Sequence, residues 1–445
     1  MSDQRARDGR PNILFLFPDQ LRHDWAGQDS SAPLRTPNLD ALRARGATFT
    51  NAVCPSPLCA PSRACLALGL EYDASPVRGN PDNLPFDRPS VYGLLRDAGY
   101  HVMGCGKFDL NKGDCIAGRD AWGPDGKRNL AEWGFSDGVN NEGKYDGVNS
   151  GRETPRGPYM RYLEERGERQ AHVADFAARG ARSAFPTPLS DEDYCDNWIG
   201  RNGLNLLDAA PSGTPWFLQV NFAGPHNPWD ITAGMRHLYA GIQFPPPTPC
   251  AAGDARAHQE VRRNYAAMVE NIDTWVGRYV TELERRGELD NTVIVFSSDH
   301  GEMLGERGRW GKSAPYQPSV GVPLIVAGPG VAPGAVRREP TTILDLASTF
   351  LAYAGVRPPD DMESVSLRGA LEHDGPGARD VVRSGLGEWR VAFDGRWKMI
   401  ARENAPDELY DLRADPQELD CLPVAAAPGA VARRLADALE RSRRG

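Results

Sequence analysis

Short apolar segments alternate with helical patterns along this chain, and this alternation limits the fold more than any other feature of the sequence. Residues 12–17, 216–222 and 292–297 are apolar runs of strand length, and 101–104 and 323–327 are shorter runs of the same kind. Strands that are separated in sequence by helices form a sheet with helices on both faces. The sequence therefore predicts an α/β protein.

Three helices are marked by their own signals. Thr36 and Pro37 predict a helix start, with Thr at the N-cap and Pro at the first helical position. Another helix is predicted over 341–354, ended by Gly355. A long helix before the 292–297 strand is predicted from apolar residues at a spacing of three or four: Tyr265, Met268, Ile272, Val276, Tyr279 and Leu283.

Two regions depart from this pattern. Residues 111–215 are rich in Gly, Pro and charge, so we expect a loop-rich insertion within a first domain, 1–368. The insertion either sets substrate specificity or is a plain surface excursion. A second unit, 369–445, is expected to be a small α+β subdomain, because it combines an Asp394-Gly395 hairpin turn, a strand at 408–412 and a final helix at 430–441.

The composition is that of an ordinary folded protein. Hydrophobic residues make up 40% of the chain and charged residues 25%, which excludes a disordered chain. The 51 basic and 60 acidic residues give a net charge of −9, which argues against general binding to nucleic acid or to an anionic membrane. A small anionic substrate is not excluded, because it responds to the charges of its own site.

The sequence shows no stretch that predicts a signal peptide or a membrane span, and no paired-cysteine motif. No apolar run approaches the roughly 20 residues that cross a bilayer, and the N-terminal segment contains no apolar signal-peptide core. We therefore expect a cytoplasmic protein with no membrane partner. The eight cysteines form no CxxC pair, so neither a zinc ribbon nor a redox motif is indicated, and most are expected to be free thiols.

Two predicted strands are followed directly by side chains that bind metals. Asp19 and Gln20 follow the first strand, and Asp299 and His300 follow the strand at 292–297. Open α/β sheets bind ligands at the ends of their strands, and these groups suit a divalent cation. Each pair alone has a plainer interpretation, since an Asp in such a position often caps a helix.

Further motifs point to an anion. Cys59 lies before a predicted helix N-terminus and beside Arg63, and both features lower the pKa of a thiol; a buried structural cysteine is an equal alternative. Each of Lys107, His226 and Lys312 alone is typical of a surface or loop residue. Together they place two ammonium groups and an imidazole around one oxyanion, the pattern for sulfuryl or phosphoryl transfer.

In this order the motifs resemble the formylglycine-dependent sulfatase family of the alkaline-phosphatase-like superfamily. The resemblance runs from residue 11 to residue 418, and Cys59-x-Pro61-x-Arg63 is its most specific element. It implies the fold of that superfamily: a sandwich with a large mixed, mostly parallel central sheet flanked by helices, plus a small α+β C-terminal subdomain. It also implies an enzyme that releases sulfate from a small sulfated substrate.

The resemblance further implies a modified nucleophile and a metal. Cys59 would be oxidised by a formylglycine-generating enzyme to Cα-formylglycine, whose hydrate attacks the sulfate ester. Calcium, with manganese or magnesium as alternatives, would be bound by Asp19, Gln20, Asp299, His300 and residue 59. Arg63 matches the residue that holds the formylglycine. Lys107, His226 and Lys312 match residues that contact the sulfate, and His226 or Lys312 would protonate the departing alcohol.

The chain departs from the family pattern at Asp109, where the family commonly has a histidine that acts as the base for expelling sulfate. Asp109 either takes over that base role or orients Lys107. Leu68 replaces a common Thr and is expected to pack. Arg307 replaces a frequent histidine and is either an anchor for a substrate carboxylate or a solvated arginine.

Three functions are therefore considered. The first is a sulfate monoester hydrolase, which Lys107 favours. The second is a phosphonate monoester or phosphodiester hydrolase with the same formylglycine, since that group often lacks a Lys at this position. The third is a non-catalytic metal-binding protein with unmodified Cys59, against which the intact metal and oxyanion positions argue. The sequence predicts neither the alcohol that is released nor the oligomeric state.

Overall fold

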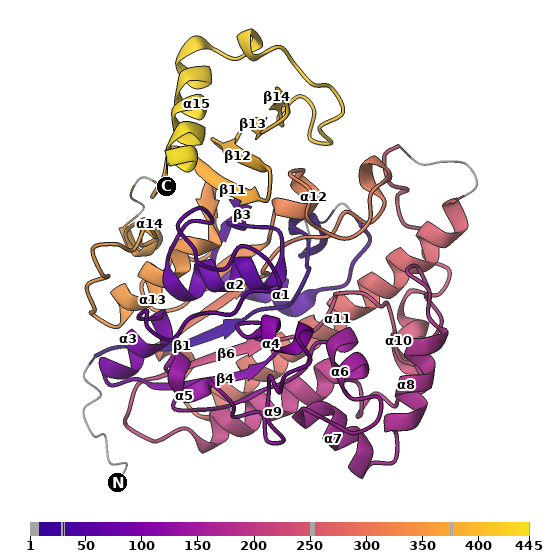
Figure 1. The fold of residues 1–445 in the computed structure, drawn as a ribbon. Helices are drawn as coiled ribbons and strands as arrows, with labels where there is room; N and C mark the ends of the chain where they lie inside the picture. The colour runs from indigo at the N-terminus through magenta and orange to yellow at the C-terminus, as the bar shows by residue number, and fades with distance from the viewer. Residues whose placement is uncertain are drawn as a thin grey trace.

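The central layer of the protein is a sheet in which strands far apart in the sequence lie side by side (Figure 1). The computed structural model describes residues 9–27, 30, 32–249, 254–373, 375 and 377–444. Within them the sheet has eight strands in the order β5-β4-β6-β1-β7-β8-β2-β9. Their bounds are β1 Asn12–Leu16, β2 Gly46–Phe49, β4 His101–Gly106, β5 Asp137–Asn140, β6 Trp216–Asn221, β7 Thr292–Ser297, β8 Leu324–Ala327 and β9 Ala335–Arg337.

Most neighbouring strands of this sheet run parallel. Strand β8 is antiparallel to both β7 and β2, and the other neighbours pair in parallel. The structure therefore confirms the mixed, mostly parallel sheet. Every strand predicted from an apolar run is present, as β1, β4, β6, β7 and β8. The short strands β2, β5 and β9 were not predicted.

Alternate side chains of β1 enter two separate cores. Ile13 and Phe15 pack with helices α2, α3 and α13, whereas Leu14 and Leu16 pack with α1, α9 and α11. Burial of both faces explains the unbroken apolar run of this strand. In Figure 1, α2 and α13 lie above the sheet and α9 lies below it. The bounds are α1 Pro37–Arg45, α2 Cys59–Leu68, α3 Val91–Asp97, α9 Cys195–Ala209, α11 Ala255–Arg285 and α13 Leu346–Tyr353.

The predicted long helix is α11, and it also caps α1. Asp273 of α11 accepts hydrogen bonds from the backbone N–H groups of Asn38 at 3.3 Å and Leu39 at 2.7 Å. Thr36 occupies the N-cap position of α1, as predicted, but its hydroxyl accepts from the N–H of Gly27 at 3.1 Å. An aspartate from another helix thus satisfies the first turn of α1.

The helix predicted over 341–354 begins later than expected. Thr341–Thr342 form strand β10, which pairs in parallel with β3, Ala52–Val53. A 3-10 turn at Ile343–Asp345 follows, and only then does α13 start. The two threonines are β-branched, and their pairing with β3 prevails over the helical pattern of the residues that follow.

Residues 111–215 contain one strand and six helices, joined by loops. Strand β5 joins the central sheet, and Gly200 and Gly203 lie inside α9. A Cβ at Gly200 would be 2.3 Å from Trp275, and one at Gly203 would be 2.0 Å from Tyr279. These glycines let α9 approach α11. The other helices here are α4 Lys112–Ile116, α5 Leu130–Trp133, α6 Lys144–Ser150, α7 Pro158–Glu165 and α8 Arg169–Ala178.

The C-terminal residues form a second, antiparallel sheet. Its strands pair in sequence order, and the predicted Asp394-Gly395 turn joins β12 to β13. Helix α15 packs on this sheet through Leu435 and Leu439. Among the described residues, no helix has the length and apolar character that a membrane span requires. The strands of this sheet are β11 Val382–Leu386, β12 Trp389–Phe393, β13 Trp397–Arg402 and β14 Ala405–Asp411, and α15 is Gly429–Arg444. Three short helices earlier in the chain are α10 Ala233–Arg236, α12 Gln317–Val320 and α14 Arg368–His373.

Candidate active site

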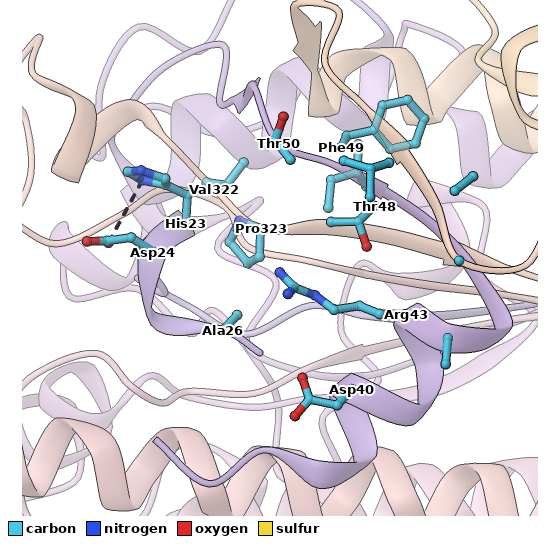
Figure 2. Close-up of a pocket in the computed structure, with 15 residues that line it drawn as sticks. His23, Asp24, Ala26, Asp40, Arg43, Thr48, Phe49, Thr50, Val322 and Pro323 are labelled. Carbon is cyan, nitrogen blue, oxygen red and sulfur yellow. Dashed lines mark ion pairs between the residues drawn. The ribbon is translucent and has the colours of Figure 1, made fainter. Parts of the chain in front are cut away.

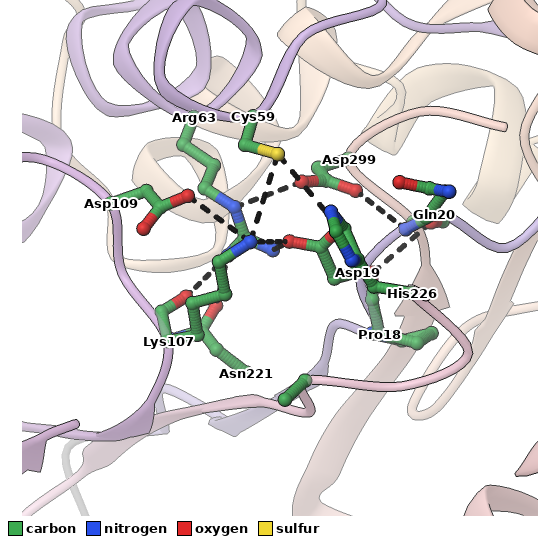
Figure 3. A network of polar contacts seen from close by, with 12 residues as sticks. Pro18, Asp19, Gln20, Cys59, Arg63, Lys107, Asp109, Asn221, His226 and Asp299 are labelled. Carbon is green, nitrogen blue, oxygen red and sulfur yellow. Dashed lines mark hydrogen bonds and ion pairs between the residues drawn. The ribbon is translucent and has the colours of Figure 1, made fainter. Parts of the chain in front are cut away.

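The predicted site residues meet at one edge of the central sheet. Asp19, Lys107, His226 and Asp299 follow β1, β4, β6 and β7, whose carboxyl ends point the same way because these strands are parallel. Cys59 is the first residue of α2. Figure 3 shows these side chains converging, with the sulfur of Cys59 directed toward the side chains from the strand ends.

Four side chains from three segments form a buried cluster that fits a metal ion. One ligand atom each from Asp19, Cys59, Asp299 and His300 lies within 4.8 Å of all the others, and all four residues are buried. Two carboxylates with one imidazole nitrogen are a donor set that divalent cations accept. The donors of these residues therefore fit a divalent metal.

Gln20 links this cluster to Lys312. The backbone N–H of Gln20 donates to Asp299 Oδ1 at 3.0 Å. Its side-chain Oε1 accepts a hydrogen bond from Lys312 Nζ at 2.7 Å. Gln20 has a φ of 70°, in the left-handed region, so the chain turns sharply directly after Asp19.

Arg63 fixes both carboxylates of the cluster. Its Nε donates to Asp299 Oδ2 at 3.0 Å, and its Nη2 donates to Asp19 Oδ2 at 3.1 Å. Its Nη1 donates to the carbonyl of Lys107 at 2.7 Å and to Asn221 Oδ1 at 3.1 Å. Arg63 thus joins α2 to the ends of β1, β4, β6 and β7.

Residue 59 lies in a positively charged environment. Cys59 Sγ is 3.0 Å from Lys312 Nζ, 3.3 Å from His300 Nε2 and 3.7 Å from Lys107 Nζ. Burial and the charge of Asp19 would raise the pKa of this thiol, but Lys107, Lys312 and His300 together lower it to about 5. The site therefore stabilises a negative charge at residue 59.

His226 and Lys312 form a hydrogen-bonded pair. Lys312 Nζ is 2.7 Å from His226 Nε2, and His226 Nδ1 contacts the carbonyl oxygen of Asn227. Because a carbonyl only accepts, Nδ1 carries the ring proton and Nε2 accepts from the ammonium. Burial, and then Lys312, lower the pKa of His226 well below its ordinary value, so the ring is neutral.

Asp109 lies between two lysines. Its Oδ2 is 3.1 Å from Lys107 Nζ and 2.8 Å from Lys112 Nζ, and Lys112 reaches Asp146 Oδ2 at 2.9 Å. Burial would raise the pKa of Asp109, but Lys107 and Lys112 hold it well below its ordinary value. A carboxylate that is so well stabilised as an anion is a weak base.

Several residues of this site were not predicted from the sequence, among them Asn221, Ser62 and Asn80. Asn221 ends β6, Ser62 Oγ donates to the carbonyl of Asp299 at 2.6 Å, and Asn80 Oδ1 accepts from the N–H of Ala60 at 3.2 Å. Asn221 had a signal in the sequence, since a polar residue near the end of an apolar strand is unusual.

The guanidinium of Arg307 lies 4.0 Å from the ring centre of Tyr316, so this arginine is engaged by an aromatic ring.

A separate cavity of about 300 Å³ lies beside α1, β2 and β8. Figure 2 shows His23, Arg43 and Phe49 among the residues that line it. None of its described lining residues belongs to the polar cluster around Cys59. This cavity is therefore distinct from the candidate active site.

Comparison with known proteins identifies the family. The model of the sulfatase family matches residues 11–356. The chain belongs to the sulfatase family. A model described as "N-sulphoglucosamine sulphohydrolase, C-terminal" matches residues 305–445. This sulfatase is similar to choline-sulfatase from Rhizobium meliloti (30% identity, 92% of this chain, 82% of that protein) and to arylsulfatase from Clostridium perfringens (26%, 92% and 89%).

Solved structures share the fold of this sulfatase. The phosphonate monoester hydrolase of Agrobacterium radiobacter has a TM-score of 0.80 and 24% identity, covering 98% of this chain and 95% of that one. A protein solved with its substrate D-glucosamine-2-N,6-O-disulfate has a TM-score of 0.76 and 21% identity, covering 98% of both chains. The fold is that of the alkaline-phosphatase-like superfamily, and the protein is a sulfuric ester hydrolase that cleaves sulfate monoesters.

Proposed function

We propose that this sulfatase uses Cα-formylglycine, formed from Cys59, as its nucleophile, and that a divalent metal, calcium for preference, is held by Asp19, Gln20, Asp299, His300 and residue 59. The position of Cys59 carries this proposal, because its Sγ lies 3.0 Å from Lys312 Nζ within a buried group of metal-binding side chains. When bound, such a metal lowers the pKa of a hydroxyl that it contacts and balances charge on the sulfate ester.

The lysines bind and neutralise the sulfuryl group. Lys107 and Lys312 both direct their ammonium groups at residue 59, from which the sulfur atom of the sulfate ester must be attacked. Charge that develops on the sulfuryl oxygens is then met by donors already in place, so little reorganisation is needed. Arg63 keeps Asp19 and Asp299 in position and does not itself need to move.

Protonation of the departing alcohol is assigned to the pair of Lys312 and His226. Lys312 donates one hydrogen bond to Nε2 of His226, whose pKa is held well below its ordinary value by burial and by Lys312. His226 therefore orients the ammonium group toward the leaving oxygen. A positioned acid of this kind contributes about 10²- to 10⁴-fold to a rate.

The mass of residue 59 tests the proposal directly. Protein co-produced with a formylglycine-generating enzyme should yield a peptide in which oxygen replaces the sulfur of Cys59 and two hydrogens are lost. Elemental analysis of the same sample should find a bound divalent metal. Fully active protein that contains only the thiol would contradict the proposed nucleophile.

Phosphonate monoester hydrolysis is a second candidate activity, since hydrolases of this class share the fold. Lys107 argues for sulfate, because phosphonate monoester and phosphodiester hydrolases with the same formylglycine often lack a lysine at this position; here its ammonium group lies 3.7 Å from Cys59 Sγ. We propose a small sulfate ester as the substrate. Release of sulfate from aryl, sugar and choline sulfates should exceed release of phenol from a phenyl phosphonate at equal concentration.

Asp109 is proposed to orient Lys107 and to balance its charge. Asp109→Asn should lower kcat by about 10- to 100-fold, because a hydrogen bond to a charged group contributes about 1.5–3 kcal/mol. Rapid mixing with 4-nitrophenyl sulfate should show slow alcohol release from the first turnover onward. Asp146→Asn is the matched control, since Asp146 contacts Lys112 without contacting Lys107. A burst of one alcohol per site before slow turnover would instead assign the base role to Asp109.

A further inference from the structure

A fully buried glutamate, Glu302, lies behind the residues that face the nucleophile. Its side chain is 0% exposed. One oxygen, Oε1, accepts hydrogen bonds from the backbone N–H groups of Leu304 at 3.0 Å and Gly311 at 2.6 Å. Gly311 directly precedes Lys312, so Glu302 closes the loop that carries this lysine.

The other oxygen of Glu302 fixes the orientation of Gln20. Gln20 Nε2 donates a hydrogen bond to Glu302 Oε2. The amide oxygen must then point the other way, where Oε1 accepts from Lys312 Nζ at 2.7 Å. Both oxygens of Glu302 accept hydrogen bonds in this arrangement, so Glu302 binds the NH₂ group of the amide and not its oxygen.

We propose that Glu302 is a positioning residue that makes Gln20 present its oxygen, and not its NH₂ group, to Lys312 and to the metal-binding cluster. This inference rests on the proposed function, since it concerns a residue proposed to hold the metal. The hydrogen bonds of Glu302 are to Gln20, Leu304 and Gly311, and among the described residues none joins it to Cys59. It acts through the amide of Gln20 and through the backbone beside Lys312.

The chemistry of the pair predicts the effect of each substitution. In Glu302→Gln, the remaining oxygen of residue 302 is needed by the N–H groups of Leu304 and Gly311, so its NH₂ group faces Gln20. Gln20 must then turn its own oxygen toward residue 302 and its NH₂ group toward Lys312. Gln20→Glu alone places two carboxylates against each other, which is also unfavourable.

The exchange of both residues should restore the arrangement. In Gln20→Glu combined with Glu302→Gln, the amide at 302 donates to one carboxylate oxygen at 20. The second carboxylate oxygen accepts from Lys312, as the amide oxygen does in the wild type. The double variant has the same number of charges as the wild type but no glutamate at position 302. If it regains the wild-type Ca²⁺ affinity, the role of Glu302 is to orient residue 20, and a glutamate at 302 is not needed for any other reason.

Calcium binding to the whole protein tests this inference. The shift of Tm with added CaCl₂ should show that Glu302→Gln weakens Ca²⁺ affinity about 10- to 100-fold, as is usual for the loss of a group that orients a ligand, and that the exchange restores it. The KM for 4-nitrophenyl sulfate should follow the same order. Glu142→Gln is the matched control, because Glu142 is also 0% exposed and accepts backbone N–H groups from Tyr159 and Met160.

The outcomes separate this inference from the function on which it rests. Wild-type protein without bound metal and without any Ca²⁺-dependent shift would overturn both. If Ca²⁺ shifts the Tm of the wild type and of Glu302→Gln equally, the proposed role of Glu302 is overturned and the proposed function is not. An exchange variant as weak as the weaker single variant would also overturn it. Glu142→Gln should lower Tm and leave Ca²⁺ affinity unchanged.

Discussion

Asp299→Ala should remove the bound metal and lower kcat/KM by about 10³-fold or more. Asp299 supplies one of two carboxylates in the cluster, and its Oδ1 also accepts the N–H groups of Gln20 and His300 at 3.0 and 2.9 Å. The substitution therefore deletes a charged ligand and loosens two further residues. Loss of several kcal/mol of charge stabilisation in the transition state corresponds to this factor.

The same substitution should also destabilise the fold, because Arg63 loses one of its two buried carboxylate partners. Breaking a buried ion pair costs about 3–5 kcal/mol. Asp345→Ala is the matched control: Asp345 is 0% exposed and binds Arg379 Nη2 at 2.7 Å, outside the cluster. It should lower Tm while metal content per folded molecule stays at the wild-type value.

Elemental analysis after gel filtration decides the role of Asp299. If Asp299→Ala does not fold, Asp299→Asn is tested in its place, because it keeps the size of the side chain and removes its charge. Asp19→Ala should behave like Asp299→Ala. Gln20→Ala should be milder, because water can replace a neutral ligand. Full metal content in folded Asp299→Ala would show that this loop does not bind the metal.

The meeting of Asp19 and Asp299 in one cluster could be predicted because it depends on strand order and register. Leu16 of β1 pairs with Phe296 of β7, and Asp19 and Asp299 follow these paired residues by the same number of positions. Two apolar runs that are each followed by an aspartate were therefore enough to predict that Asp19 and Asp299 lie close together. Once the strands were recognised, parallel pairing was enough to bring the two side chains together.

The contacts between side chains could not be predicted in the same way. Glu302 and Asn221 are polar residues beside recognised motifs, and nothing in their spacing shows that one orients Gln20 and the other accepts from Arg63. The position of Asp109 between Lys107 and Lys112 depends on the left-handed backbone at Asp109, with a φ of 54°. Backbone turns of this kind, outside a regular element, have no periodicity to reveal them.

Helices that depend on neighbours were the main omission in the fold. No helix was predicted within residues 111–215, but in α9 Gly200 and Gly203 allow Trp275 and Tyr279 of α11 to approach the helix backbone. Tyr279 donates to the carbonyl of Gly200 at 2.9 Å, which secures the contact. Intrinsic propensity counts against such a helix, and packing against another element decides its formation.

Cys59→Ala should abolish sulfate release while leaving the site able to bind sulfate. If residue 59 supplies the nucleophile, its loss should lower kcat on the order of 10⁴- to 10⁶-fold. The groups that neutralise the ester remain, since Lys107, Lys312 and Arg63 keep partners other than residue 59. Calorimetric titration with inorganic sulfate measures this retained binding separately from turnover.

Cys65→Ala is the matched control, because it removes a second buried thiol from the same helix, α2. Burial, and then Glu71, raise the pKa of Cys65, so its environment is unsuited to an anion and contrasts with that of Cys59. We expect Cys65→Ala to lower Tm, because it leaves a small cavity, and to retain kcat. Equal loss of activity in both variants would attribute the effect of Cys59→Ala to damage in α2. Substantial turnover in Cys59→Ala would place the nucleophile on another residue.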